Sequence, residues 1–272
     1  MNLRSAAEPT AGSSAAVAIG IDVGGTSVKA AAVDTVTAEL VSSRVKRDTP
    51  PSATPEDIAD IAAALITEIS DELGAATPPP LGMCVPSVMK NGRSLTAANI
   101  ERSWINFPAH EFFAKRFGER FAILNDADAA GLAELRHGAA KNKEGVTVLL
   151  TLGTGIGSAL IHNSTLIEGS ELGHLDIGGQ IDFEKHAAPS VIHKEQLTLQ
   201  EWAQRLSRYL RHLEILLHPD RFLLGGSISK DSSEFLPLEG VKTPVAPARF
   251  LNNAGIIGAA VAAALAENES DR

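Results

Sequence analysis

Two glycine-rich turns, each between two apolar segments, are the parts of this sequence whose residue types point most directly to chemistry. The turn residues are Gly24, Gly25 and Thr26 in the first, and Gly153, Thr154 and Gly155 in the second. Because glycine has no side chain, backbone N–H groups in such turns can converge on an anion. Two turns facing each other from two halves of one molecule predict a clamp for a chain of phosphates.

The glycines also fit other known kinds of turn less well or less specifically. A Walker A loop needs a Gly-Lys pair, and the sequence contains none. The run Gly153-Thr-Gly-Ile-Gly157 differs in spacing from a dinucleotide-binding fingerprint, and a strand-like segment follows it. A purely structural role, in which the glycines only make tight hairpins, stays open for each turn taken alone.

Two charged residues accompany the first turn. Asp22 ends the strand before it, and its carboxylate could hold Mg²⁺, through water, because Mg²⁺ keeps several of its waters. An Asx-turn cap is a compatible role for the same side chain. Lys29 lies in the following strand, where it could reach a phosphate or line the surface.

The pair Asn125-Asp126 follows an apolar strand at 121–124 and precedes a helix at 127–137. Ligands in α/β proteins bind at the carboxyl ends of strands, so Asp126 could accept the proton of a substrate hydroxyl. Asp is also a favoured N-cap, and Asp128 is a rival for the catalytic role.

A third candidate site is Glu171 with His174, three residues apart in a glycine-flanked segment. On one turn, the carboxylate could accept and the imidazole could donate hydrogen bonds to a polyhydroxylated ligand. A Glu-x-x-His pair also resembles half of a metal site, but no matching cysteines accompany it.

Composition limits the classes of function. The apolar content of 44% supports a core, the net charge is −9, and aromatic residues make up only 4%, which argues against base stacking on nucleic acid. Cys84 is the single cysteine, so a disulfide framework is excluded, and its apolar surroundings predict a buried core residue. No apolar run reaches the roughly 20 residues of a membrane span, and no signal peptide is evident, so we expect a cytoplasmic protein.

The elements alternate between strand and helix and restart near residue 140, which predicts an α/β protein of two related halves with a cleft between them. We expect a disordered tail at 1–15, an N-terminal α/β domain at 16–138, a C-terminal α/β domain at 139–266 and a tail at 267–272. The last helix, at 254–266, could pack back on the N-terminal domain.

Five motifs in order resemble the ROK family of sugar kinases, over about residues 17–266. They are Asp22-Val-Gly-Gly-Thr-x-x-Lys29, Leu124-Asn-Asp-Ala127, Leu152-Gly-Thr-Gly-Ile-Gly157, Gly169-x-Glu-x-Gly-His174 and Leu224-Gly-Gly-x-x-Ser229. The resemblance implies the actin/hexokinase-like (ribonuclease H-like) duplicated fold. Within the family, the segment 219–226 and the short length are most similar to the polyphosphate glucokinase branch, of the polyphosphate/ATP-glucomannokinase type.

The resemblance also implies roles for residues. Asp126 matches the general base, and the sugar-binding positions are Asn99, Asn125, Asp126, Glu171, His174 and, as a compensating glutamate, Glu195. The two turns match the phosphate loops, and Gly225 and Gly226 match a loop near the nucleotide base. The cysteine-rich zinc module of many members is absent, so no zinc is expected.

The implied reaction is phosphoryl transfer from polyphosphate or ATP to the 6-hydroxyl of glucose, and of mannose, with Mg²⁺, by a monomer or homodimer that binds neither nucleic acid nor membrane. The alternatives are a strictly ATP-dependent hexokinase of the family and a sugar-sensing regulator without a DNA-binding domain. A polyphosphate chain would need a basic track. Its candidate residues are Lys29, Arg44, Lys46, Arg47, Lys90, Arg93, Lys141 and Lys143.

Overall fold

The structure is a computed structural model that describes residues 17–97 and 100–270, in two compact units. Unit 1 comprises the chain up to Ala133 together with the segment from Asn253 onward, and unit 2 comprises Glu134–Asn252. The division lies inside helix α3 (Asp126–His137), whereas the sequence analysis placed it after Gly138, because packing rather than the end of an element sets it. The tail expected at 1–15 lies outside the described residues.

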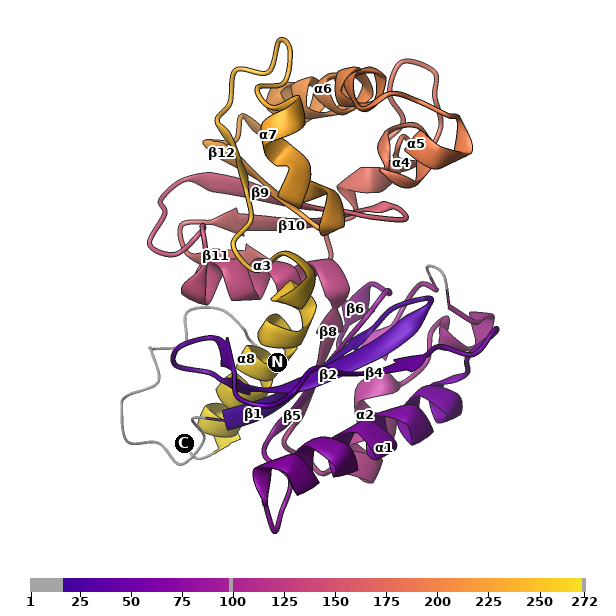
Figure 1. Cartoon of the computed structure of the whole chain (residues 1–272), viewed down its shortest axis with the longest axis vertical. Coiled ribbons are helices and arrows are strands. Elements are labelled where there is room, and N and C mark those ends of the chain that lie inside the picture. Colours follow the sequence, from indigo (N-terminus) through magenta and orange to yellow (C-terminus); the bar gives the residue numbers. More distant parts are fainter. Residues whose placement is uncertain (1–16, 98–99, 271–272) are drawn as a thin grey trace. The chain divides into compact units, whose positions relative to one another are not determined.

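Unit 1 is a mixed sheet between helices (Figure 1). The strand order is β3-β2-β1-β5-β8, and β4 also pairs with β2. The strands are β1 (Val17–Val23), β2 (Ser27–Asp34), β3 (Glu39–Leu40), β4 (Val45–Asp48), β5 (Leu81–Val85) and β8 (Phe121–Asn125), with a separate hairpin of β6 (Met89–Lys90) and β7 (Arg93–Ser94). The other elements are α1 (Pro55–Leu73), η1 (Arg102–Trp104), α2 (Ala109–Phe117) and α8 (Ala254–Ser270).

Strand β1 shows why the sheet of unit 1 has a helix layer on each face. Its side chains alternate, and Ile19 and Ile21 are fully buried in a core that includes Ile58 and Leu65 of α1. Gly20 lies between them and therefore faces the other way, against α8. A Cβ on Gly20 would lie 1.9 Å from the carbonyl oxygen of Ile256 in α8. The helix packs this closely because the strand has no side chain there.

Helix α8 belongs to unit 1 although it is the last element of the chain. It extends through Ser270, whereas the sequence analysis ended the helix at residue 266 and expected a tail at 267–272. Glu267 is 8% exposed and its carboxylate pairs with Arg120, so the helix is anchored beyond its apolar stretch.

Unit 2 contains a five-stranded sheet in the order β11-β10-β9-β12-β13. The strands are β9 (Val146–Leu152), β10 (Ile156–His162), β11 (Thr165–Ile167), β12 (Arg221–Gly225) and β13 (Val245–Pro247). The helical elements are η2 (Leu172–His174), α4 (Glu184–Ala187), α5 (Ser190–Lys194), α6 (Leu199–Leu217), η3 (Ser227–Asp231), α7 (Ser232–Phe235) and η4 (Leu251–Asn253). Trp202, Leu206 and Tyr209 of α6 pack with Val148 and Leu150 of β9 in the core.

The two long amphipathic helices begin in the same way. Thr54 before α1 and Thr198 before α6 each accept a hydrogen bond from the backbone N–H three residues later, at Asp57 and Glu201. The carboxylates of Asp57 and Glu201 bond back to the threonine N–H groups, which completes a capping box. Both helix starts are thus encoded locally.

The two sheets repeat one arrangement of strands. In unit 1, β1 pairs antiparallel with β2 and parallel with β5. In unit 2, β9 pairs antiparallel with β10 and parallel with β12. Each glycine turn of the sequence connects the antiparallel pair, so the two turns occupy equivalent places.

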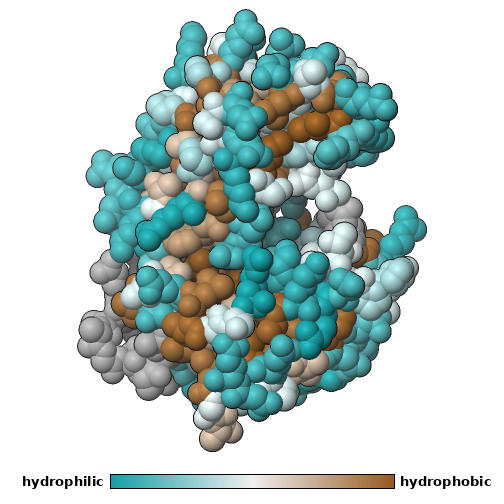
Figure 2. All heavy atoms as spheres, viewed as in Figure 1, coloured by the Kyte–Doolittle hydropathy of each residue, from teal (hydrophilic) through white to brown (hydrophobic). Residues whose placement is uncertain are grey.

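The surface is predominantly hydrophilic on the face shown in Figure 2. Among the described residues, no helix is both long enough and apolar enough to span a bilayer.

We predict that Gly82→Ala destabilises unit 1. A Cβ there would lie 1.8 Å from the carbonyl oxygen of Ala259 in α8, so β5 and the helix must separate. Overpacking of this kind costs about 1–3 kcal/mol or more, measurable by urea unfolding. The matched control is Gly153→Ala, whose Cβ meets nothing within 4 Å and should change the stability by less than about 0.5 kcal/mol. Equal losses in the two variants would contradict the packing argument.

Candidate active site

One edge of the unit 1 sheet gathers the candidate residues of that unit. Strands β1, β5 and β8 are parallel, with Asp22 level with Cys84 and Val85 level with Asn125. Their carboxyl ends therefore meet at the same edge. Asp22 lies near the end of β1, the first glycine turn follows β1, and Asp126 follows β8. This edge is where α/β proteins place ligands.

The first glycine turn is held from its carbonyl side by one residue, Thr49. The N–H of Thr49 donates to the carbonyl oxygen of Thr26 at 3.1 Å, and the Thr49 hydroxyl donates to the carbonyl oxygen of Gly24 at 2.7 Å. Gly24 N–H closes the turn on Ser27 O at 3.0 Å. Gly25 and Thr26 are exposed, so an anion can approach the turn from solvent.

Asp22 and Lys29 face each other across the β1–β2 pair. Asp22 Oδ2 lies 3.5 Å from Lys29 Nζ, and Asp22 Oδ1 accepts a hydrogen bond from the Cys84 thiol at 3.6 Å. Burial, and then the charges of Asp22 and Asp126, raise the pKa of Cys84 well above its usual value. The thiol is therefore protonated at neutral pH and acts as a buried donor to Asp22.

Asn125 caps helix α3, although Asp126 Oδ1 also accepts the N–H of Ala127, at 2.8 Å. The side-chain oxygen of Asn125 accepts the N–H groups of Ala127 at 2.8 Å and Asp128 at 3.0 Å, and its amide donates to Ser87 O at 3.2 Å. Asp126 is half-buried in the first turn, where the helix dipole favours a negative charge. The rival residue Asp128 is 3% exposed, so Asp126 is the more accessible of the two carboxylates.

The second glycine turn is held in the same manner as the first. Ser190 donates its N–H to Gly153 O at 3.3 Å and its hydroxyl to Thr154 O at 2.7 Å. The N–H of Ile156, just after the turn, donates to Glu184 Oε2 at 2.9 Å. Gly153 and Thr154 are exposed.

Gly225 and Gly226 lie beside this second turn. Gly225 is level with Thr151 across the parallel β9–β12 pair. Gly226 has a φ of 85°, and a Cβ on it would lie 2.1 Å from Leu152 O. Only glycine allows the loop after β12 to lie this close to the end of β9.

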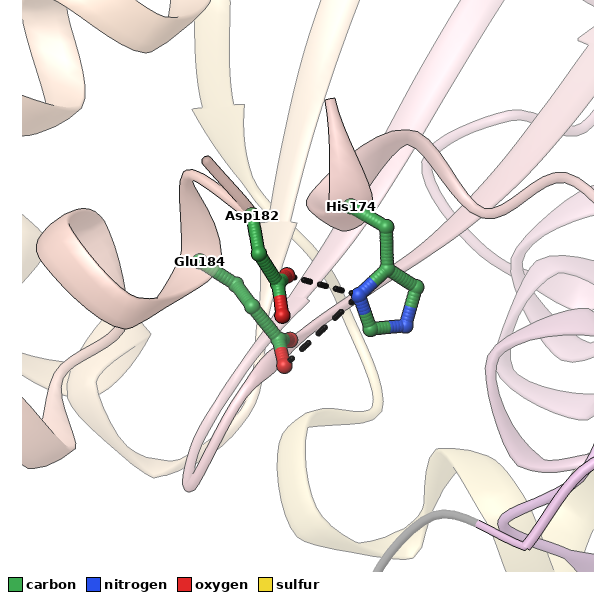
Figure 3. A group of neighbouring side chains, drawn as sticks. All are labelled: His174, Asp182 and Glu184. Atoms are coloured by element: carbon green, nitrogen blue, oxygen red, sulfur yellow. Dashed lines mark hydrogen bonds and ion pairs between the residues drawn. The ribbon is translucent and has the colours of Figure 1, made fainter. Parts of the chain in front are cut away.

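A cluster of three acids surrounds His174, and we call Glu171, His174, Asp182 and Glu184 the His174 cluster. His174 Nδ1 lies 2.8 Å from Asp182 Oδ1 and 3.9 Å from Glu184 Oε1 (Figure 3). His174 Nε2 lies 3.6 Å from Glu171 Oε2. The ring is half-exposed, so one imidazole connects three carboxylates at a solvent-accessible position.

Electrostatics in the His174 cluster shifts two groups in the same direction. The hydrogen bond that the His174 ring donates to Asp182, with the charges of Glu184, Asp182 and Glu171, raises the pKa of His174 against the effect of burial. Burial, and then the charge of Glu184, raise the pKa of Glu171, although His174 opposes this. Both groups therefore retain protons to higher pH than exposed residues of their types.

The geometry of His174, Asp182 and Glu184 also suits a cation, because one donor atom of each lies within 4.8 Å of the others. These atoms are already engaged, however. Asp182 Oδ1 accepts from the ring and Asp182 Oδ2 pairs with Lys185 Nζ at 2.7 Å, while Glu184 Oε2 holds Ile156 N–H. The network is satisfied by hydrogen bonds and ion pairs.

Some predicted site residues lie elsewhere. Glu195 ends α5 and pairs with Arg205 at 2.7 Å, which lowers its pKa, and it is not part of the His174 cluster. Glu184 is the glutamate that the structure brings to His174, and the sequence analysis missed it together with Asp182. Asn99 lies outside the described residues.

The candidates for a basic track do not form one group. Lys29 and Lys46 are directly opposite each other on β2 and β4. Arg47 is paired with Glu68 at 2.6 Å and Arg44 with Asn253 at 2.9 Å. Lys90 and Arg93 lie on the β6–β7 hairpin, while Lys141 and Lys143 belong to unit 2.

Residues 18–191 match the ROK family. The chain is 46% identical over 244 residues, 89% of each chain, to a polyphosphate glucokinase of Mycobacterium tuberculosis (strain CDC 1551 / Oshkosh). It is 34% identical to a glucokinase of Thermotoga maritima over 164 residues, which are 58% of this chain and 50% of the relative.

Two solved structures resemble this chain over most of its length. The inorganic polyphosphate/ATP-glucomannokinase from Arthrobacter sp. strain KM has a TM-score of 0.87 and 41% identity, covering 92% of this chain and 99% of the other. A glucokinase of Streptomyces griseus, solved in complex with glucose and AMPPNP, has a TM-score of 0.71 at 24% identity. These likenesses confirm the expected actin/hexokinase-like α/β fold.

We predict that Glu184→Gln lowers the pKa of Glu171 toward its usual value. Glutamine keeps an oxygen for Ile156 N–H but removes the charge that, after burial, raises this pKa. A pH titration of carboxyl-¹³C-labelled glutamate by NMR measures the change. Glu195→Gln is the control and should leave Glu171 unchanged, because Glu195 pairs with Arg205. A shift of the Glu171 pKa in Glu195→Gln but not in Glu184→Gln would contradict this, because Glu195 would then be the glutamate nearer to Glu171.

Proposed function

Because this chain belongs to the ROK family, we propose that it transfers a phosphoryl group from inorganic polyphosphate or ATP to the 6-hydroxyl of glucose, and also of mannose. The observation that carries the proposal is the 46% identity, over 89% of both chains, to a polyphosphate glucokinase. The likeness to a polyphosphate/ATP-glucomannokinase supports both donors and both sugars.

The donor phosphates are bound by the two glycine turns. Each turn is fixed through its carbonyls, by Thr49 and by Ser190, and leaves glycine and threonine exposed for phosphate oxygens. Phosphoryl transfer is mostly positioning and charge stabilisation, so rigid turns are suited to it. Gly225 and Gly226 belong to the same end of the unit 2 sheet and face the nucleotide when ATP is the donor.

Asp22 fits the role of a Mg²⁺-binding residue. Its carboxylate is 18% exposed at the strand end beside the first turn, and Mg²⁺ takes one or two carboxylates together with substrate phosphates and water. When bound, the ion would neutralise charge on the donor phosphates. Lys29, 3.5 Å from Asp22, supplies a further positive charge at this place.

The sugar is held by the His174 cluster. Glu171 and Glu184 offer carboxylate oxygens that accept hydrogen bonds from sugar hydroxyls, and His174 offers Nε2. Asn125 contributes by capping α3, which fixes the position of the next residue, Asp126. Glu195 is ion-paired elsewhere and has no role in this scheme.

Asp126 is the general base. Its place at the carboxyl end of β8 and its partial exposure allow it to accept the proton of the 6-hydroxyl as that oxygen attacks phosphorus. The proton passes to the Asp126 carboxylate, the bond between the transferred phosphorus and the donor's bridging oxygen breaks, and ADP or the shortened polyphosphate leaves. The sugar phosphate forms without a covalent enzyme intermediate.

Use of polyphosphate requires cations that continue from the turn. The opposed pair Lys29 and Lys46 is the best candidate in unit 1, because Lys29 lies in the strand that follows the first turn and Lys46 lies opposite it on β4. Arg47 is engaged with Glu68 and is a weaker candidate.

We predict that Asp126→Asn lowers kcat by about 10²–10⁴-fold, the scale of general-base catalysis, while glucose binding is retained. Steady-state kinetics and calorimetric titration with glucose measure the two quantities. Asp128→Asn is the matched comparison in the same helix turn. Near-normal turnover of the first variant, or a larger loss in the second, would overturn the assignment of the base.

The proposed function is tested by assaying the purified chain with glucose and Mg²⁺, with ATP and polyphosphate as parallel donors and glucose 6-phosphate as the measured product. We expect product with polyphosphate, and we expect its KM to rise with added salt because surface charge attraction is screened. Product with ATP alone would establish the strictly ATP-dependent alternative. No product with either donor would reject the kinase proposal.

A further inference from the structure

The contact between His174 and Asp182 is the shortest in the His174 cluster. Nδ1 of the ring lies 2.8 Å from Asp182 Oδ1, compared with 3.6 Å between Nε2 and Glu171 and 3.9 Å between Nδ1 and Glu184 (Figure 3). An ionised carboxylate only accepts hydrogen bonds, so this contact requires a proton on Nδ1. In the neutral ring, the lone pair is then on Nε2.

We infer that Asp182 is a positioning residue for the sugar site, which fixes the tautomer and the orientation of His174 so that Nε2 is the nitrogen presented to the sugar. This inference rests on the proposed function, because it assumes that His174 contacts the sugar. It concerns a residue that does not itself need to touch substrate.

The chain around Asp182 is built to hold its carboxylate in place. Its backbone N–H donates to Asp176 Oδ1 at 2.8 Å, and its second oxygen pairs with Lys185 at 2.7 Å. The next residue, Phe183, is 1% exposed, and its N–H donates to Leu175 O at 2.9 Å. Asp182 is thus fixed on both sides, so its carboxylate can define the position of the ring.

Phe183 anchors this segment to the core of unit 2. Its ring stacks on Tyr209 of α6 with centroids 6.0 Å apart, and the guanidinium of Arg208 lies 5.4 Å from the Phe183 centroid. Arg208 also donates to Gln180 at 3.0 Å and to Ile177 O at 3.3 Å. The segment 176–183 is irregular in conformation but is attached at several points to the amphipathic helix α6.

The charges around the ring favour the same arrangement. The groups facing His174 are Glu171, Asp182 and Glu184, and Lys185 faces Asp182 from the other side. Although burial opposes it, hydrogen bonds from Lys185 and His174 keep the pKa of Asp182 below its usual value, so this residue stays ionised. The raised pKa of His174 means that the ring takes up a second proton, on Nε2, at a higher pH than a free histidine.

The sign of the pH effect follows from this shift. Removal of the Asp182 carboxylate takes away the largest cause of the raised pKa of His174, so the variant ring loses its Nε2 proton at lower pH. It also frees Nδ1, so the neutral ring can place its proton on either nitrogen. A purely structural role for Asp182 would produce neither change.

The test compares Asp182→Ala and Asp182→Asn with the parent protein. Asp182→Ala should raise the KM for glucose by about 10–100-fold, the scale known for outer partners of metal-bound histidines, with the donor KM changed less than about 3-fold. Asp182→Asn should show a smaller rise, because an amide oxygen can still accept the Nδ1 proton. His174→Ala sets the upper limit of the effect.

Two further variants separate positioning from general effects. Lys185→Met removes the other partner of Asp182 but keeps the bond to His174, and Glu239→Gln removes an exposed carboxylate of the same unit. Both should leave the glucose KM within about 3-fold. An effect of Lys185→Met equal to that of Asp182→Ala would overturn the inference, because Asp182 would then act only by anchoring its loop.

The second readout is independent of activity. In ¹⁵N-histidine-labelled protein without substrate, His174 should titrate as the Nδ1–H tautomer, and Asp182→Ala should lower its pKa and mix the tautomers. An unchanged tautomer and pKa in folded Asp182→Ala would overturn the inference. If the parent protein makes no glucose 6-phosphate, the proposed function fails, while the NMR result still decides whether Asp182 controls the ring.

Discussion

The pairing of one strand with two different neighbours is the constraint on which the rest of each unit depends. β1 and β9 each pair antiparallel with the next strand and parallel with a later one. The antiparallel partner requires a tight turn at the end of the strand. The parallel partner runs in the same direction, so its carboxyl end lies at the same edge of the sheet as the turn. The glycine turn and the polar residues after the parallel strands therefore lie at the same edge of the sheet, as Asp22 and Asp126 do in unit 1.

Each glycine turn is held in place through its backbone carbonyl groups. In both units, one hydroxyl residue supplies this support by donating its N–H and its hydroxyl to two turn carbonyls. Thr49 and Ser190 come from different kinds of segment, a loop before α1 and the start of α5. The same physical requirement has the same solution in each half, and residues of each turn remain exposed to solvent.

The sequence predicted those parts of the site that depend on local pattern. The two hairpins and Asn125-Asp126 after a strand follow from periodicity and glycine placement, and the structure has strands and turns at those places. The roles of Asn125 and Asp126 were harder to separate. Both residue types are favoured caps and both side chains accept the N–H of Ala127, so only the hydrogen bond from the Asp128 N–H shows that Asn125 caps α3.

The parts that could not be predicted depend on contacts without a local signal. Residues 176–197 have no regular period, and the structure has only the short helices α4 and α5 there. Asp182 and Glu184 reach His174 because Phe183 between them is buried against α6, a contact that spacing does not reveal. Glu195, which the sequence analysis placed with His174, pairs with Arg205 on α6 instead, and spacing does not reveal this contact either.

The central claim is that this ROK-family chain binds its sugar at His174, and glucose binding observed at that ring tests it most directly. In ¹⁵N-histidine-labelled protein titrated with glucose, the account predicts saturable shifts of the His174 ring nitrogens, and little change on addition of tripolyphosphate alone. Unmoved His174 resonances at glucose concentrations that calorimetry shows to be saturating would contradict it.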